Sequence, residues 1–222
     1  MKILIIGRTG SGKDTVARTL FDHFGLTQLV SHTTRPKRTP TENTHIFVSK
    51  EEAAMLTDRV AETKIGEYEY FATREAFNDC DIYVIDPRGM NDLFSKTPDE
   101  EYLVCYVWAN KDVRLQRARL RGDDHALEVK RFVAREESES KQFDAFEKDW
   151  FNLSNDELTM QTDLSKMKKR YPNICSFCFI KNNSKNMKKL EKVACVMHNV
   201  MYIQEELPEF KNAEIKTMSF IN

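Results

Sequence analysis

The chain has 222 residues, of which 41% are hydrophobic and 31% are charged, and its formal net charge is -1. This length predicts one medium-sized domain, alone or with an appendage, and the apolar share is large enough for a buried core. The balanced charge argues against a nucleic-acid-binding protein, and no apolar run is long enough to cross a membrane. No secretory context accompanies the five cysteines. We therefore expect a cytoplasmic protein whose thiols are reduced or bind a metal.

Apolar runs and helical patterns alternate along the chain. We expect strands at residues 2–6, 26–30, 81–86 and 102–108, with helices at residues 13–24, 89–94 and 111–120. The first run meets glycines too soon to be a signal peptide, so we interpret it as a buried strand. Strands that alternate with helices predict an α/β fold with a parallel sheet, whose ligands bind at the carboxyl ends of the strands.

Three segments interrupt this alternation. Residues 33–80 are polar and rich in turns, residues 121–142 are charged throughout, and the chain beyond about residue 163 is rich in Lys, Asn and Cys. We predict one domain over residues 1–162, in which 33–80 and 121–142 are insertions. Residues 163–222 then form a C-terminal extension.

The strongest motif is the run Gly7-Arg-Thr-Gly-Ser-Gly-Lys13. It matches the phosphate-binding loop G-x-x-x-x-G-K between a strand and a helix, which predicts a three-layer P-loop fold. Glycines let the backbone approach phosphate oxygens, and the helix N-terminus presents amide donors to them. Lys13 is expected to reach the β- and γ-phosphates of ATP. The residues assigned to this site are Gly7, Thr9, Gly10, Ser11, Gly12, Lys13, Asp14 and Thr15.

The residue after the loop lysine departs from the motif. Ser or Thr normally follows, and its hydroxyl binds magnesium, whereas this chain has Asp14 and then Thr15. A carboxylate would repel phosphate unless it faces magnesium or solvent, and Thr15 could supply the hydroxyl instead. Asp86 ends a buried strand, which is the usual position of a magnesium-linked carboxylate. We therefore expect Asp14, Thr15 and Asp86 to lie near Mg²⁺.

A second cluster, Ser31-His-Thr-Thr-Arg35-Pro-Lys-Arg38, follows the strand expected at residues 26–30. A planar guanidinium group binds two phosphate oxygens at once, so two arginines preceded by hydroxyls suit a phosphate dianion. A solvated basic turn is the alternative for this segment taken alone.

With these motifs the chain resembles guanylate kinase over about residues 2–160. In the family's order, the matching runs are the phosphate loop, the Ser31 to Arg38 cluster, Phe47-Val48-Ser49, Tyr70-Phe-Ala-Thr73, Val84-Ile-Asp86-Pro-Arg-Gly89, Arg121-Gly122 and Asn155-Asp156. The resemblance implies transfer of the γ-phosphate of ATP to GMP with Mg²⁺.

The resemblance also assigns roles. The implied substrate-binding residues are Ser31, Arg35, Arg38, His45, Glu62, Phe71, Thr73 and Asp86. The first three hold the phosphate of GMP, Glu62 and Thr73 read its guanine base, and Asn155 lies near the adenine of ATP. His45 and Phe71 stand where the family usually has tyrosines, so Tyr70 or His45 could replace a lost phenol.

Arginines crowd the charged insertion and the helix before it. Arginines on a mobile lid can close over ATP, exclude water and stabilise the charge that develops in phosphoryl transfer. The resemblance implies that Arg121 and Arg131 are catalytic phosphate contacts together with Lys13, and Arg117 and Arg135 come next. A salt-bridged amphipathic helix is the alternative, because glutamates lie among the arginines.

The C-terminal extension carries a cysteine pattern outside the resemblance. Cys175, Cys178, Cys195 and His198 have the spacing C-x2-C and C-x2-H, which is compatible with a closed structural Zn²⁺ site. Alternatively, Cys195 lies on an amphipathic helix and is core. The extension could be a zinc-stapled appendage, a dimerisation element in a protein that is monomeric or homodimeric, or a helical cover.

Three functions remain open at this point. The leading prediction is an ATP:GMP phosphotransferase. A second is a related kinase of another phosphorylated acceptor, such as a ribose phosphate, which the missing tyrosines favour. The third is a non-catalytic binding module, which the intact Lys13 and its glycines oppose.

Overall fold

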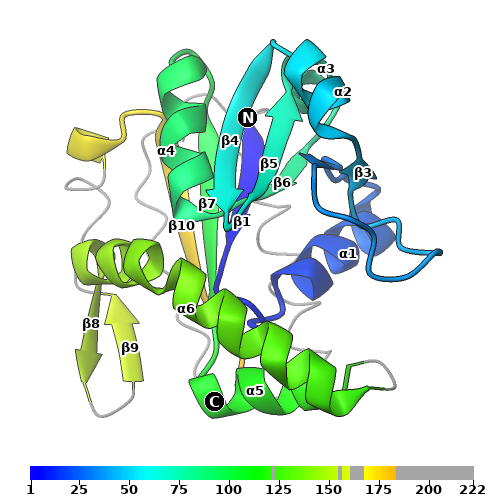
Figure 1. Ribbon diagram of the computed structural model, residues 1–222. Helices are drawn as coiled ribbons and strands as arrows, with labels where there is room; N and C mark the ends of the chain where they lie inside the picture. The colour runs from blue at the N-terminus through cyan, green and yellow to red at the C-terminus, as the bar shows by residue number, and fades with distance from the viewer. Residues whose placement is uncertain (122–123, 155–156, 161–167, 184–222) are drawn as a thin grey trace.

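The computed structural model describes residues 1–121, 124–154, 157–160 and 168–183, with the backbone alone for 152–154 and 157–160. A parallel sheet in the order β10-β7-β1-β6 forms its centre (Figure 1). Its strands are β1 (Lys2–Ile6), β6 (Ile82–Val84), β7 (Tyr102–Trp108) and β10 (Ile174–Lys181). Every residue of β7 is buried, as expected for a parallel strand covered on both faces.

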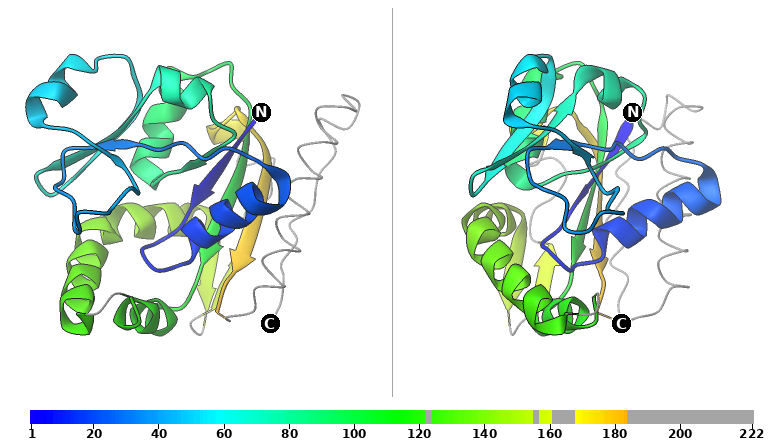
Figure 2. Two further views of the ribbon diagram at one scale, coloured as in Figure 1. Left: turned by 90° about the vertical axis from the view of Figure 1, so that its right-hand side faces the viewer. Right: turned by 45° about the vertical axis from the view of Figure 1, so that its right-hand side comes forward.

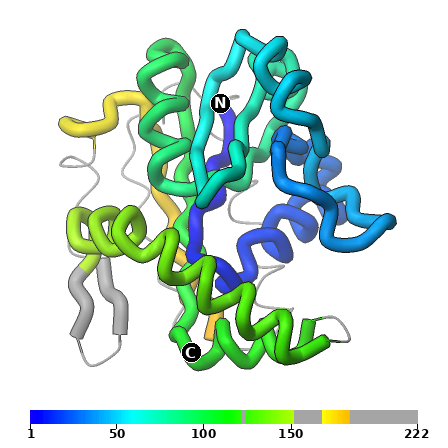
Figure 3. The backbone as a smooth tube through the Cα atoms, in the orientation of Figure 1, coloured from blue at the N-terminus to red at the C-terminus, as the bar shows by residue number. Residues whose placement is uncertain are grey.

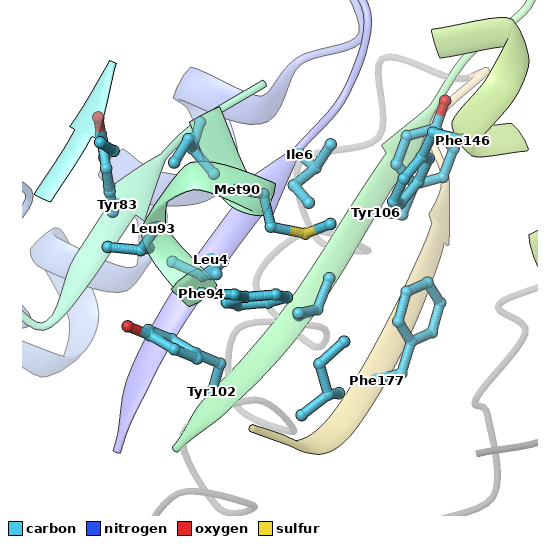
Figure 4. Packing of buried hydrophobic residues seen from close by; sticks show 14 of the residues in the cluster. Leu4, Ile6, Tyr83, Met90, Leu93, Phe94, Tyr102, Tyr106, Phe146 and Phe177 are labelled. Carbon is cyan, nitrogen blue, oxygen red and sulfur yellow. The ribbon is translucent and has the colours of Figure 1, made fainter. Parts of the chain in front are cut away.

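Helices cover both faces of this sheet, which gives three layers (Figure 2). The helices found in the described residues, not all of which contact this sheet, are α1 (Lys13–Phe24), α2 (Lys50–Met55), α3 (Arg74–Asn78), α4 (Pro87–Lys96), α5 (Lys111–Arg119) and α6 (His125–Trp150). On one face α1 packs Val16 and Leu20 against β1 and β7. On the other, Met90 of α4 and Phe146 of α6 join the larger core cluster (Figure 4). The predicted three-layer α/β fold is confirmed.

Within the described residues, a second and a third sheet lie outside the central one. The second sheet has the order β3-β2-β5-β4 and consists of β2 (His32–Thr33), β3 (Ile46–Phe47), β4 (Arg59–Ile65) and β5 (Tyr68–Thr73). The third sheet is the antiparallel pair β8 (Phe151–Ser154) and β9 (Glu157–Met160). The segment expected as an acceptor-binding insertion, residues 33–80, thus supplies most of the second sheet.

The strand expected at residues 26–30 is only partly present. Gln28 forms a single parallel bridge with Ile82 at the margin of the central sheet. Val30 is 42% exposed, so the run is not buried as a central strand would be. The side chain of Asp81 instead accepts from the backbone and the hydroxyl of Thr27.

The boundary expected at residue 163 is wrong, because β10 belongs to the central sheet. It pairs in parallel with β7 along its whole length, from Ile174 opposite Tyr102 to Lys181 opposite Trp108. Phe177 and Phe179 of β10 are buried in the larger core cluster. Residues 184–222 lie outside the described residues.

The segment expected as a lid, residues 121–142, is not a separate insertion. Residues 125–142 belong to α6, a continuous helix of 26 residues. The second half of α6 is fixed in the core through Phe143, Phe146 and Trp150. The helix crosses near the region where β1 ends and α1 begins, and its first half extends beyond that region (Figure 3). Within the described residues, no helix is long and apolar enough to span a membrane.

Candidate active site

The phosphate loop links β1 to α1, and its glycines have the conformations that the motif requires. Gly10 and Gly12 have left-handed backbones, with φ of 77° and 98°. A Cβ atom on Gly7 would lie 2.4 Å from the Val107 carbonyl oxygen, so no larger residue fits there. Among the described residues, no side chain caps the N-terminus of α1. The loop and this open helix end therefore offer an anion site.

One cavity of about 430 Å³ runs from the phosphate loop to the second sheet and to α6. The predicted residues that line it are Gly7, Thr9, Gly10, Lys13, Asp14, Ser31, Arg35, Arg38, His45, Glu62, Asp86, Arg121 and Arg131. Ser11, Gly12, Thr15, Phe71 and Thr73 are not among its lining residues. The structure thus brings together the two phosphate-binding motifs of the sequence, which lie about 20 residues apart along the chain.

Asp14 and Thr15 differ in their access to this cavity. The Asp14 side chain is 72% exposed, and its carboxylate lies 3.9 Å from the Lys13 amine. The Thr15 hydroxyl does not line the cavity, because it occupies the next position around α1. Asp14 therefore fits the solvent-facing or magnesium-facing orientation, whereas the expected contribution of Thr15 has no support in this geometry.

Two arginines of the second cluster, Arg35 and Arg38, line the cavity. The pKa of Arg38 is lowered by burial and by the nearby charges of Arg35 and Arg131. Cations gathered in this way attract a dianion, since an anion between them relieves their mutual repulsion. Arg35 and Arg38 lie in the loop that follows β2, and Arg131 belongs to α6, so a bound phosphate would join this loop to the helix.

Glu42 is a member of this cluster that sequence reasoning missed. Its carboxylate accepts from Arg35 Nη2 at 2.8 Å and from the Arg38 amide at 2.6 Å. The hydrogen bond from Arg35 lowers the pKa of Glu42 to about 2. A carboxylate that holds a guanidinium in this way fixes its orientation. The residue lies in a polar turn, where a glutamate gives no pattern by which it could be singled out.

His45 lies beside Ser31, and the Ser31 hydroxyl is 2.9 Å from His45 Nδ1. Burial, together with the charge of Arg35, lowers the pKa of His45 to about 4. The imidazole is therefore neutral near pH 7 and retains one N–H to donate. Its ring also meets the edge of Tyr70 at 5.5 Å.

The second sheet has two faces, and only one of them forms the cavity wall. Thr63 pairs with Tyr70 across β4 and β5, and both line the cavity with Ser31 and His45. Neighbouring residues on a strand point to opposite faces. Glu62 pairs with Phe71, so their side chains belong to the other face.

Three predicted substrate-binding residues are packed or paired within the protein. Phe71 is fully buried and stacks on His32 with 5.1 Å between ring centroids. Thr73 caps α3 by accepting from the Ala76 amide. Both are corrected: they support the fold and do not line the cavity. Glu62 borders the cavity, but its carboxylate is paired with Arg59 at 3.1 Å.

Asp86 lies where the sequence predicts, at the cavity and directly after β6. Its Oδ1 accepts from the Thr63 hydroxyl at 3.1 Å and from the amides of Arg88 and Gly89 at 2.9 Å each. Asp86 is thus also the N-cap of α4. All three of these bonds end on Oδ1, so Oδ2 is the atom through which Asp86 would meet a metal ion or a substrate.

The arginines of α6 enter the cavity already paired with carboxylates of the same helix. Arg131 donates to Glu128 at 2.5 Å, and Arg135 donates to the buried Glu139 while lying over the Tyr70 ring. Burial raises the pKa of Glu139, and the charges of Arg135 and Lys13 oppose that rise. Glu139 is a second residue whose place in the cavity the sequence did not reveal. Arg121 also lines the cavity and is exposed.

Arg117 has another position than the one expected. The resemblance places it among the phosphate contacts, yet its guanidinium donates to the carbonyl oxygens of Gly10 and Ser11 at 3.1 and 3.0 Å. These carbonyls lie on the outer side of the phosphate loop. Arg117 therefore supports the loop from behind. Asn182, which directly follows β10, donates to the same Ser11 carbonyl at 2.8 Å.

The remaining predicted sites fall partly outside the described residues. Cys175 and Cys178 lie on β10, where the Cys175 thiol contacts the Tyr102 carbonyl oxygen and Cys178 pairs with Cys105 of β7. Cys195, His198 and Asn155 lie outside the described residues, so the zinc site and the adenine contact stay predictions. The strand before Asn155, β8, belongs to a separate sheet.

Comparison with known proteins places this geometry in a known fold. No protein-family model and no curated protein matches the chain. The structure is similar to a guanylate kinase from Anaplasma phagocytophilum, with a TM-score of 0.50 and 15% identity over 97% of this chain and 87% of that one. The chain has a kinase-like P-loop fold. A sugar kinase from a Janibacter species is less similar, with a TM-score of 0.44 and 15% identity over 90% of this chain and 94% of that one.

Proposed function

We propose that this protein is a magnesium-dependent kinase that transfers the γ-phosphate of ATP to the phosphate group of a small acceptor. One observation carries the proposal: the phosphate loop and the Arg35–Arg38 cluster border a single cavity. Phosphoryl transfer needs little beyond two aligned phosphate sites and charge stabilisation. An ionised phosphate oxygen is already a nucleophile, so no dedicated base is required.

Each charged group at the cavity then has a task. Lys13 and the loop amides hold the ATP phosphates, and Arg121 and Arg131 approach from the opposite wall to stabilise the transferred group. Arg35 and Arg38 hold the acceptor phosphate. The carboxylates of Asp86 and Asp14 would hold a magnesium ion through the oxygen ligands that it prefers, and the ion would supply charge neutralisation for the phosphates of ATP.

GMP is the acceptor that the sequence resemblance implies. For GMP, Glu62 would accept from the guanine N1–H and amino group. Glu62 borders the cavity, which supports this assignment, and it would have to share its carboxylate with Arg59. We keep ATP:GMP phosphotransfer as the first acceptor hypothesis.

A phosphorylated sugar is a second acceptor hypothesis, and the register of β4 and β5 favours it. The side chains of the cavity face are Thr63, Tyr70, Ser31 and His45, which carry hydroxyl and imidazole groups. Such groups bind sugar hydroxyls but lack the carboxylate that reads guanine. Thr73, whose hydroxyl the resemblance predicts to read the guanine base, instead uses this hydroxyl to cap α3.

An ADP-release assay across GMP, dGMP, AMP, UMP, CMP and ribose phosphates tests both the kinase activity and the identity of the acceptor. We expect turnover with at least one acceptor. The rate of turnover should fall at least about 100-fold in Lys13→Met, because this variant lacks the positive charge that stabilises the phosphates during transfer. Lys50→Met is the matched control, since Lys50 is exposed on α2. Absence of turnover with every acceptor would contradict the kinase proposal.

The same assay separates the two acceptors. If GMP is the substrate and Glu62 reads guanine, Glu62→Gln should reduce the preference for GMP over AMP by about 10-fold or more. Turnover with a ribose phosphate and none with GMP would reject the first hypothesis and support the second. Unchanged selectivity in Glu62→Gln with active GMP turnover would show that another residue reads the base.

A further inference from the structure

The outer side of the phosphate loop needs its own hydrogen-bond donors. A loop that points its amides at phosphates turns carbonyl oxygens the other way, and buried carbonyls require partners. Here the Gly10 and Ser11 carbonyls accept from Arg117, and the Ser11 carbonyl also accepts from Asn182 Nδ2. Two side chains from different parts of the chain therefore satisfy the back of the loop.

Asn182 is held rigidly at this place. It is only 7% exposed. Its backbone N–H donates to the Trp108 carbonyl oxygen at 2.7 Å, which continues the pairing of β10 with β7. The backbone carbonyl oxygen of Asn182 accepts from Arg117 Nη2 at 2.8 Å. Arg117 and Asn182 thus form one bonded unit behind the loop.

The approach of Asn182 to the loop is also very close. A Cβ atom on Gly12 would lie 2.3 Å from Asn182 Nδ2, so only glycine leaves room for this amide. Gly12 begins α1 and precedes Lys13, so the position of Asn182 bears directly on the residues that face the phosphates.

From these contacts we propose that Asn182 is a positioning residue of the ATP site, which makes the end of β10 part of the nucleotide-binding machinery. Asn182 and the Arg117 guanidinium fix the Gly10–Ser11–Gly12 peptides so that their amides point into the cavity. Donors on the carbonyl side of a peptide also polarise it, which strengthens its N–H as a donor to phosphate. This inference rests on the proposed kinase function and names a residue that acts through the loop.

Direct binding of Mg·ATP by calorimetry, together with steady-state kinetics, tests the proposal on the full chain. Asn182→Ala removes the side-chain donor but keeps the backbone bond to Trp108. We expect the Kd for ATP to rise about fivefold to tenfold, the size expected for one lost hydrogen bond. The KM of the acceptor should change less than about twofold, because Asn182 does not line the cavity.

Asn183→Ala is the matched control. Its side-chain oxygen accepts from the backbone amide of Asn110, at the start of α5, at 2.9 Å, and its Nδ2 donates to Asn110 Oδ1 at 3.2 Å. Among the described residues its side chain forms no hydrogen bond with the loop. We expect ATP affinity in this variant to stay within about twofold of the parent. An equal loss in both variants would mean that Asn182 merely supports the fold, and would overturn the proposal.

Two further outcomes keep the test decisive. If Asn182→Ala does not fold, Asn182→Asp keeps the size of the side chain and replaces the donor by an acceptor, so it should weaken ATP at least as strongly. Unchanged ATP affinity in a folded Asn182 variant overturns the inference while leaving the kinase proposal intact. Failure of the parent protein to bind Mg·ATP would instead contradict the kinase proposal.

Discussion

At the scale of single residues, the cavity is lined by arginines that carboxylates hold in place. Arg35 pairs with Glu42, Arg131 with Glu128, and Arg135 with Glu139. Within the described residues each of these guanidinium groups therefore has a fixed partner before any substrate enters. A bound phosphate would compete for the same donors, and the pairs keep the arginines oriented toward it. His45, whose pKa is lowered to about 4, lines the same cavity as a neutral imidazole.

The pH dependence of stability should report the buried His45. Its pKa is lowered from 6.5 to about 4, so between these values the unfolded chain binds a proton that the folded protein does not. The free energy of unfolding therefore rises as the pH increases through this window, and the contribution is lost as the pH falls toward 4. For this group alone the change is at most about 3 kcal/mol.

Urea unfolding between pH 4 and pH 7 measures this effect. We expect His45→Gln to flatten the rise relative to the parent protein, whereas His23→Gln should leave it unchanged, because His23 is exposed on α1. Identical pH profiles in the parent and in His45→Gln would contradict the assignment of a buried neutral imidazole.

At the scale of elements, α6 links the cavity to the central sheet. Arg8 of the phosphate loop pairs with Glu147 and Asp144, and Arg114 of α5 pairs with Glu136. Glu147 also accepts from the hydroxyl of the buried Tyr106. The helix therefore serves both as an arginine-bearing wall of the cavity and as a support of the loop.

The pair of Arg114 and Glu136 gives a test of this linkage. The Arg114 side chain is 4% exposed, so Glu136→Ala leaves a buried charge without its carboxylate. Such a change typically destabilises a protein by about 3–5 kcal/mol. Chemical unfolding should show this loss, whereas Glu137→Ala, on the exposed side of α6, should cost less than about 0.5 kcal/mol. A similar small effect in both variants would contradict the structural role of the pair.

At the scale of the whole molecule, β10 closes one side of the central sheet and completes the aromatic core. Phe177 is 4% exposed and lies 5.0 Å from Trp150 between ring centroids. Phe179 packs near Tyr106 and Phe151. Residues from three distant parts of the chain therefore share one cluster, and the end of that strand reaches the phosphate loop.

Replacement of Phe177 should consequently destabilise the entire domain and not a local appendage. We expect Phe177→Ala to lower the free energy of unfolding by about 3–5 kcal/mol in a single transition. Thermal unfolding followed by tryptophan fluorescence and by loss of ATP binding should give the same lowered midpoint. Lys169→Ala, at an exposed position before β10, should have no such effect. An early transition that leaves ATP binding intact would show that β10 unfolds separately.

The sequence by itself determined the elements whose evidence is local. The phosphate loop, α1 and β7 are found where their patterns predict them, because glycine spacing, helical periodicity and a continuous apolar run each act over a few residues. The Ser31 to Arg38 cluster also lines the predicted cavity. Its position at the cavity agrees with the prediction, although the strand expected before it is present only as the bridge between Gln28 and Ile82.

Tertiary structure decided the features that depend on pairing between distant segments. Side chains alternate along a strand, so the register of β4 and β5 places Thr63 and Tyr70 on the cavity face and Phe71 on the other. These two strands form a local hairpin with a two-residue turn at Gly66 and Glu67, but which of its faces meets the cavity depends on its packing against α4 and the central sheet. The same holds for β10 and Asn182, whose place beside β7 and the phosphate loop results from contacts across more than 70 residues of chain. The chemistry of phosphate binding was therefore readable from the sequence, while the identity of the acceptor and the support of the loop depend on long-range packing.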